Sequence, residues 1–119
     1  MTDALWDYPE TAGRTDATGY NVEAFDGSAG HVEDVALEQG VSYLVVDTGP
    51  SVFGRKVLIP AGAVDRIDRE AEKVFLSLPR EALDDAPQYD AKRPFDDEQR
   101  DELSRYYAGR VERSRARRG

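Results

Sequence analysis

The chain has 119 residues, of which 39% are hydrophobic and 34% are charged, and its formal net charge is −8. This length favours one domain with room for a terminal extension, and it excludes a large multidomain enzyme. Cysteine is absent and His31 is the only histidine, which excludes a disulfide framework, a zinc–thiolate site and a histidine pair. No apolar run approaches the roughly 20 residues of a membrane-spanning helix, and the first residues do not resemble a signal peptide. We therefore expect a cytoplasmic protein.

In chain order, residues 1–17 show no sustained period and predict a flexible leader, with Trp6 and Tyr8 as its anchors. From Gly19 the sequence changes to short β-branched runs separated by turn residues. These runs predict six strands, at residues 20–25, 31–37, 41–48, 56–60, 63–68 and 73–78. Such spacing favours an all-β barrel or sandwich. Shifts in the apolar phase predict β-bulges after Val32 and after Val64.

The two central strands, residues 41–48 and 56–60, carry apolar residues at both parities. Because alternate residues face opposite sides, both faces of these strands need cover, and a helix, a loop or a second copy could supply it. The stripe of four apolar residues on the C-terminal helix is too narrow to cover all of the second face, so we predict a homodimer, with Tyr43, Val45 and Leu58 in its interface. The loop between these two strands presents Val52 and Phe53, which are either tucked over a barrel end or offered to a partner.

After the strands, residues 78–83 predict a short helical turn, and Asp96 is the expected N-cap of a second helix, with Gln99 at the reciprocal capping-box position. An apolar stripe then recurs at helical spacing to about residue 112. It packs on the chain's own sheet or docks on a partner protein, and its members are Leu103, Tyr106, Tyr107 and Val111.

Charge changes sign along the chain. Residues 1–54 contain ten acidic residues and one basic residue, whereas residues 110–119 contain five arginines and one acidic residue. The basic run is interpreted as a solvated helix end, which the helix dipole favours, or as a contact for nucleic acid or an anionic membrane. The residues for that contact would be Arg113, Arg115, Arg117 and Arg118. Because the rest of the chain is acidic and repels phosphate, we do not expect nucleic acid as the principal partner.

Among the adjacent carboxylates of the chain, the three candidate pairs for acid–base chemistry begin at Glu33, Asp84 and Asp96. Adjacent strand residues point to opposite faces, so the first pair does not converge unless a bulge intervenes, and the other two stand at helix starts, where acids are expected. The glycines are spaced as turn residues rather than as a phosphate-binding loop. We therefore expect no catalytic residues, no bound metal and no organic cofactor.

Taken in order, five segments resemble the PRC-barrel family over residues 18–90. They are Gly19-Tyr20-Asn21-Val22, the stretch from Asp26-Gly27 to Val35, Tyr43-Leu44-Val45-Val46-Asp47-Thr48-Gly49, Gly54-Arg55-Lys56-Val57-Leu58-Ile59-Pro60 and Val64-Asp65-Arg66-Ile67-Asp68. The resemblance, which extends to stand-alone bacterial members, implies a small barrel of about six short strands that ends in a helical turn. With the amphipathic helix and basic tail expected over residues 91–119, the predicted fold is mainly β. It also implies a non-enzymatic adaptor or assembly module that works by self-association and by binding an unidentified protein. His31 stands where the family would have a lysine or another polar residue. An RNA-binding or RNA-processing role through the arginine-rich tail is the alternative.

Overall fold

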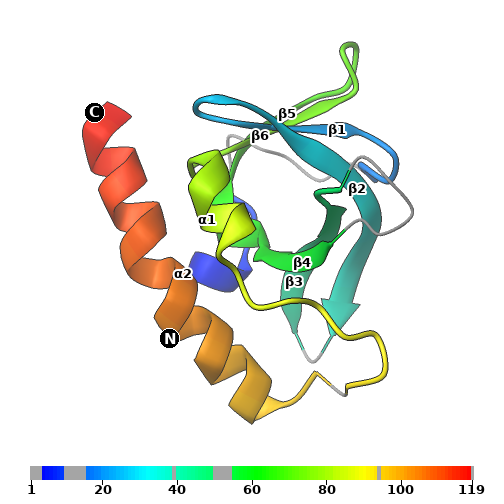
Figure 1. Cartoon of the computed structure of the whole chain (residues 1–119), viewed down its shortest axis with the longest axis vertical. Coiled ribbons are helices and arrows are strands. Elements are labelled where there is room, and N and C mark those ends of the chain that lie inside the picture. The colour runs from blue at the N-terminus through cyan, green and yellow to red at the C-terminus, as the bar shows by residue number, and fades with distance from the viewer. Residues whose placement is uncertain (1–3, 10–15, 39, 50–54, 94, 119) are drawn as a thin grey trace.

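The computed structural model describes residues 4–9, 16–38, 40–49, 55–93 and 95–118. Within these ranges, six strands and two α-helices form a mainly β fold, with the long C-terminal helix beside the sheet (Figure 1). The elements are η1 Ala4–Trp6, β1 Asn21–Ala24, β2 Gly27–Glu38, β3 Val41–Asp47, β4 Lys56–Pro60, η2 Ala61–Ala63, β5 Val64–Asp68, β6 Lys73–Leu76, α1 Arg80–Asp84 and α2 Asp97–Arg118. All six predicted strands are present, and β4 has the predicted bounds. No helix within the described ranges has the length and apolar character needed to cross a membrane.

The strands form one curved sheet in the order β4-β3-β2-β1-β6-β5. Neighbouring strands are antiparallel except β1 and β6, which are parallel. In the described part of the chain no ladder joins β4 to β5, so the sheet is not a closed barrel. The six strands of the predicted barrel are therefore present as a curved, open sheet, and closure of the barrel is not observed.

The outer edge of β4, where a closing strand would pair, is occupied by the segment after α1. Gln88 forms an antiparallel bridge with Val57, and the Tyr89 amide donates to the Lys56 carbonyl at 2.7 Å. Arg55 anchors the start of this segment by donating from its guanidinium to the carbonyls of Asp84, the last residue of α1, and Ala86. These bonds satisfy backbone groups that would otherwise remain open at a sheet edge.

Strand β2 is longer than predicted because it begins at Gly27, in a run of small residues that carries no strand signal. Its register with β3 shifts between Val32 and Asp34, and the register of β5 with β6 shifts between Val64 and Arg66. Both predicted bulges are therefore confirmed. A further bulge lies opposite β1, beside Gly30, whose φ is +138°. A Cβ at this glycine would lie 2.1 Å from the Asp47 carbonyl oxygen, so only glycine fits there.

The inner face of the sheet forms the core. The strand registers place seven nearly fully buried side chains on this face: Val22, Val32, Leu44, Val46, Val57, Ile59 and Val74. Burial of this apolar surface is the main stabilising contribution to the fold.

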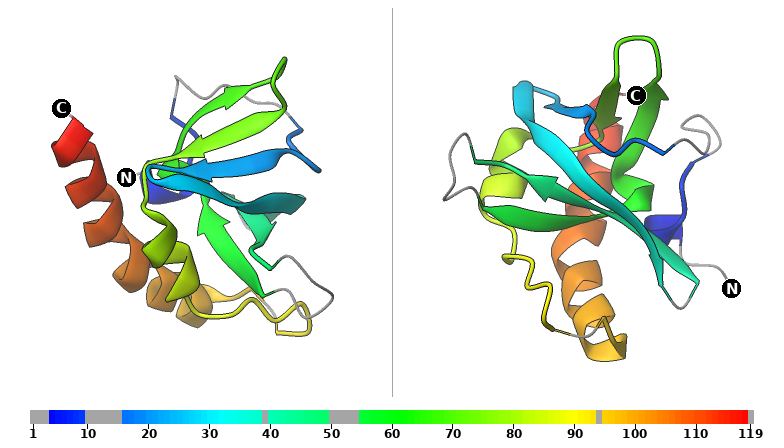
Figure 2. Two further views of the ribbon diagram at one scale, coloured as in Figure 1. Left: turned by 45° about the horizontal axis from the view of Figure 1, so that its top comes forward. Right: turned by 90° about the vertical axis from the view of Figure 1, so that its right-hand side faces the viewer.

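The outer face of β3 and β4 is covered by other parts of the same chain. The ring of Phe95 stacks on Tyr43 with the centroids 5.0 Å apart, and Trp6 meets Phe95 edge-on at 5.6 Å. The Trp6 indole N–H donates to the Ser104 hydroxyl of α2 at 2.9 Å. Figure 2 shows η1 and α2 on this side of the sheet. The helical stripe therefore packs in cis, and Trp6 is an anchor of the N-terminal segment, as predicted.

Candidate functional site

Most residues predicted to lie in a protein interface are buried within the single chain. Tyr43, Val45, Leu58, Leu103 and Tyr107 are at most 3% exposed. Tyr106 is half-buried. Val52 and Phe53 lie outside the described residues. The prediction assumed that one narrow helical stripe was too small to cover the second face of β3 and β4, but Trp6 and Phe95 complete that cover. The homodimer stays a prediction, and it needs another surface.

The neighbouring tyrosines of α2 have different surroundings. The Tyr106 hydroxyl donates to the Ala82 carbonyl of α1 at 2.7 Å, whereas the buried Tyr107 hydroxyl has no hydrogen-bond partner among the described residues. Burial raises the pKa of both phenols above the ordinary value of 10.0, and the rise in pKa is much larger for Tyr107. Tyr106 therefore links the two helices, while Tyr107 serves as a core side chain.

The arginines near the C-terminus are partly engaged within the chain. Arg110 lies over the Tyr106 ring at 3.8 Å and donates to the Tyr106 carbonyl at 2.6 Å. Arg115 donates to the Gly62 carbonyl at 2.5 Å, while Arg113 is exposed. Helix α2 continues to Arg118, beyond the predicted end near residue 112, but the side chains of Arg117 and Arg118 are not described.

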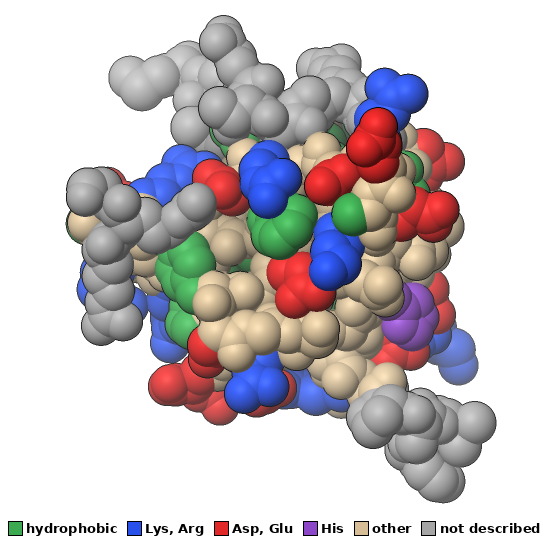
Figure 3. Space-filling model, turned by 90° about the horizontal axis from the view of Figure 1, so that it is seen from above, with side chains coloured by type: hydrophobic (Ala, Val, Ile, Leu, Met, Phe, Trp, Pro, Cys, Tyr) green, Lys and Arg blue, Asp and Glu red, His purple; other side chains and the backbone are tan. Residues whose placement is uncertain are grey.

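A groove that the sequence prediction missed lies on the outer face of β1, β6 and β5. The registers bring Glu23, Phe75 and Arg66 side by side across these strands. Phe25 follows β1 and is 41% exposed. The groove has a volume of about 360 Å³, and we call it the aromatic groove; it is lined by Glu23, Ala24, Phe25, Gly27, Asp65, Arg66, Phe75 and Leu76. Figure 3 looks onto this side of the molecule, where hydrophobic side chains lie among charges of both signs.

The charges at the aromatic groove balance. The Arg66 guanidinium lies 4.0 Å from the centroid of the Phe75 ring, a cation–π arrangement. The Lys73 ammonium lies 3.6 Å from a Glu23 carboxylate oxygen. The lining itself holds two anions, Glu23 and Asp65, and one cation, Arg66; Lys73, paired with Glu23 beside the groove, supplies the second cation in a chain whose net charge is −8. Phe75 could have been found from its parity, because it points away from the buried Val74 and Leu76.

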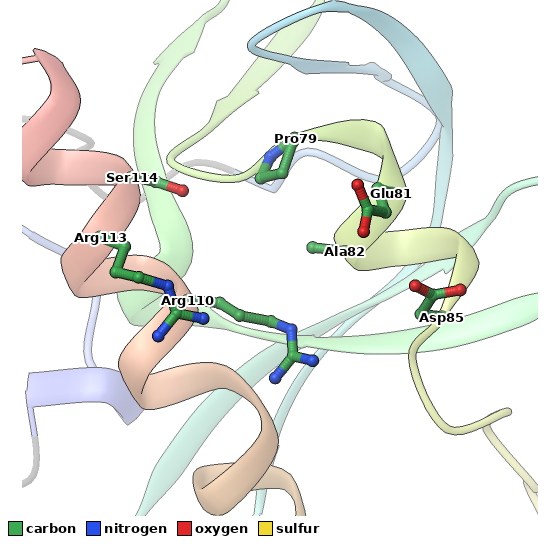
Figure 4. Close-up of a pocket in the computed structure, with 7 residues that line it drawn as sticks. All are labelled: Pro79, Glu81, Ala82, Asp85, Arg110, Arg113 and Ser114. Atoms are coloured by element: carbon green, nitrogen blue, oxygen red, sulfur yellow. The ribbon is translucent and has the colours of Figure 1, made fainter.

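A second hollow, of about 250 Å³, lies between α1 and α2, and we call it the interhelical cleft. One wall carries Arg110, Arg113 and Ser114 of α2, and the other carries Pro79, Glu81, Ala82 and Asp85 (Figure 4). The wall from α2 is positive and the wall from α1 is negative. This arrangement is suited to a ligand with charges of both signs.

The histidine and the carboxylate pairs singled out in the sequence are spread over several elements. The described parts of the chain hold no group of three or more His, Asp or Glu side chains placed to bind a metal ion. His31 is exposed on the outer face of β2. The bulge falls at Glu33, so Glu33 and Asp34 do not alternate as on a regular strand; the Lys56 ammonium lies 2.8 Å from a Glu33 carboxylate oxygen, and the Asp34 carboxylate accepts from the Val35 amide. Asp84 and Asp85 lie at the end of α1, so the expectation that this pair stands at a helix start is wrong.

No protein-family model and no curated protein sequence matches the chain. The likeness to the PRC-barrel family therefore rests on the sequence motifs alone.

Proposed function

We propose that the chain is a non-enzymatic assembly module of the PRC-barrel type, acting in the cytoplasm by self-association and by binding other proteins. The observation that carries this proposal is the unequal cover of the sheet. Over β3 and β4 the outer face is closed by Trp6, Phe95 and α2. Over β1, β6 and β5 it presents the aromatic groove.

The chemistry of the groove suits a protein partner. Aromatic and arginine side chains are the residue types that most often dominate binding at protein interfaces. The walls of the groove stand on three hydrogen-bonded strands, so little ordering is needed when a partner binds.

A second copy of the chain is the partner that the charges favour. Two chains of net charge −8 repel one another, and this repulsion is weakest where the local charge is zero. In a two-fold dimer the same patch meets itself, so Arg66 and Lys73 of one copy can face Glu23 and Asp65 of the other. A stable dimer buries at least roughly 1,200 Å² in total, so the contact would extend beyond the groove to neighbouring outer-face residues.

The test is the mass in solution, by light scattering behind size exclusion at micromolar protein. We expect about twice the 13.3 kDa of one chain. Arg66→Glu should give a single-chain mass. The new carboxylate, together with Glu23 and Asp65, would face the same three acidic groups of the other copy, and the cation–π contact would be lost. The matched control is Arg105→Glu on the exposed side of α2, which should retain the dimer. A wild-type mass of one chain, or a dimer that survives Arg66→Glu, would contradict the assignment of the groove.

Nucleic-acid binding is less well supported than protein binding. Arg110 and Arg115 already donate to carbonyls of the chain, and the remainder of the molecule is acidic. Binding would depend on Arg113 and on Arg117 and Arg118 at the helix end. Retardation of RNA by the intact protein at moderate salt, lost in an Arg113→Gln variant, would favour this alternative.

A further inference from the structure

The interhelical cleft carries an inference that is independent of self-association. Its two walls are fixed before any ligand binds. The Tyr106 hydroxyl of α2 donates to the Ala82 carbonyl of α1 at 2.7 Å, and Arg55 holds the end of α1 through the carbonyls of Asp84 and Ala86. The width of the cleft is thus set by hydrogen bonds to backbone atoms.

The charged groups on the two walls face each other without meeting. Within the described residues no ion pair of 4 Å or less joins Arg110 or Arg113 to Glu81 or Asp85. Arg110 is held back by its bond to the Tyr106 carbonyl and by the Tyr106 ring. Figure 4 shows the Ser114 hydroxyl directed into the cleft from the same wall as the two arginines. Opposite charges held apart across a gap attract a ligand that carries both signs.

The size and floor of the cleft restrict that ligand. A volume of about 250 Å³ lies below the usual range for drug-sized molecules, so the ligand is small. The Ala82 methyl group and the Pro79 ring supply the apolar part of the lining.

We propose that the interhelical cleft binds a free α-amino acid as a zwitterion. The carboxylate of the ligand accepts hydrogen bonds from Arg110, Arg113 and Ser114. The planar guanidinium groups of the two arginines match the geometry of a carboxylate. Its ammonium group donates to Glu81 and Asp85, and its side chain rests on Ala82 and Pro79. An anion alone would be repelled by the acidic wall, and a cation alone by the arginines.

The experiment is a titration of the ¹⁵N-labelled full chain, followed by backbone amide shifts at constant ionic strength. The probes are glycine, L-alanine and L-serine, with acetate and methylammonium as half-ligands that carry one charge each. We expect saturable shifts at Ala82 and Ser114 with the amino acids, and much weaker binding of either half-ligand. Arg113→Gln and Glu81→Gln should each weaken amino-acid binding about tenfold, because each removes one charge-assisted contact.

Matched controls are Arg105→Gln and Glu98→Gln, which are exposed on α2 and do not line the cleft. Both should bind the amino acids as the wild type does, and unchanged circular dichroism would show that all four variants are folded. Equal binding of acetate would mean an anion site, equal binding of methylammonium would mean a cation site, and no saturable shift would mean no site. Each of these three results overturns the proposal. None of them bears on the mass of the protein in solution, so the proposed self-association is tested separately.

Discussion

Tyr106 and Tyr107 are adjacent in sequence, and their rings meet edge-on with the centroids 4.8 Å apart. The Tyr106 hydroxyl is satisfied by the Ala82 carbonyl, whereas the Tyr107 hydroxyl is buried without a partner. Helical spacing placed both residues in one apolar stripe, but it did not separate these roles. The difference arises because only Tyr106 reaches the backbone of α1, a contact between residues 24 positions apart.

This difference predicts how alkaline pH affects stability. Burial raises the pKa of Tyr107 well above 10.0, so above pH 10 the unfolded chain loses this proton while the folded chain keeps it. The stability that Tyr107 contributes in its neutral form is present below pH 10 and falls as the pH rises towards the raised pKa. Tyr107→Phe should therefore reduce the loss of stability on going from about pH 9 to pH 11, measured by urea unfolding.

Tyr106→Phe is compared with Tyr107→Phe at neutral pH, because burial also raises the pKa of Tyr106 and alkaline pH would not separate the two residues. At neutral pH Tyr106→Phe should lower the free energy of unfolding by about 1 kcal/mol through loss of its hydrogen bond, whereas Tyr107→Phe should be neutral or stabilising. An equal loss of stability in the two variants at neutral pH would show that the Tyr107 hydroxyl has a partner in solution.

At the scale of elements, helix α2 shows what local sequence determines. Its start was predicted from the N-cap, and the Gln99 backbone N–H donates to the Asp96 carboxylate at 2.9 Å. The reciprocal capping-box bond is not made, because the Gln99 side-chain oxygen has no partner. The end was predicted too early because no large apolar residue follows Val111. The last turns are held instead by Arg115 on the Gly62 carbonyl, a contact that no local pattern indicates.

Strands were predicted well and their spatial relations poorly. Alternation of apolar residues and breaks in that alternation located all six strands and two of the bulges. The parallel pairing of β1 with β6, and the bridge from Gln88 to β4, depend on long-range packing that a single sequence does not show. The aromatic groove was missed for the same reason, since only that parallel pairing brings Phe25 and Phe75 together.

Packing of α2 against its own sheet predicts a large effect of Leu103→Ala. Leu103 is buried, and truncating a buried leucine costs about 2–5 kcal/mol of unfolding free energy. Ala108→Ser, on the exposed side of the same helix, should change it by less than about 0.5 kcal/mol. Thermal or urea unfolding by circular dichroism measures both. A small effect of Leu103→Ala would mean that α2 does not pack on the sheet in solution.

On the scale of the whole molecule, segments from the two ends of the chain form one layer over β3 and β4. Trp6 is 1% exposed and joins Phe95 to Ser104. Trp6→Ala should therefore lower the free energy of unfolding by about 3–5 kcal/mol, as expected for a buried tryptophan. Trp6→Phe keeps an aromatic ring and loses the hydrogen bond, so its cost should be clearly smaller.

Urea unfolding of the two Trp6 variants at neutral pH measures this difference. If Trp6→Ala left the unfolding midpoint unchanged, the N-terminal segment would not contribute to the layer in solution.

The covering layer also affects how the protein is made. Chains emerge from the ribosome N-terminal end first, at about 5–20 residues per second. The strands that carry Tyr43, Val45 and Leu58 leave it before Phe95 and α2, which lie later in the chain. For a few seconds the nascent sheet thus presents apolar side chains that the finished molecule hides. A ribosome stalled ahead of Phe95 would hold these side chains exposed to non-native contacts for longer, because the residues that cover them have not yet been made.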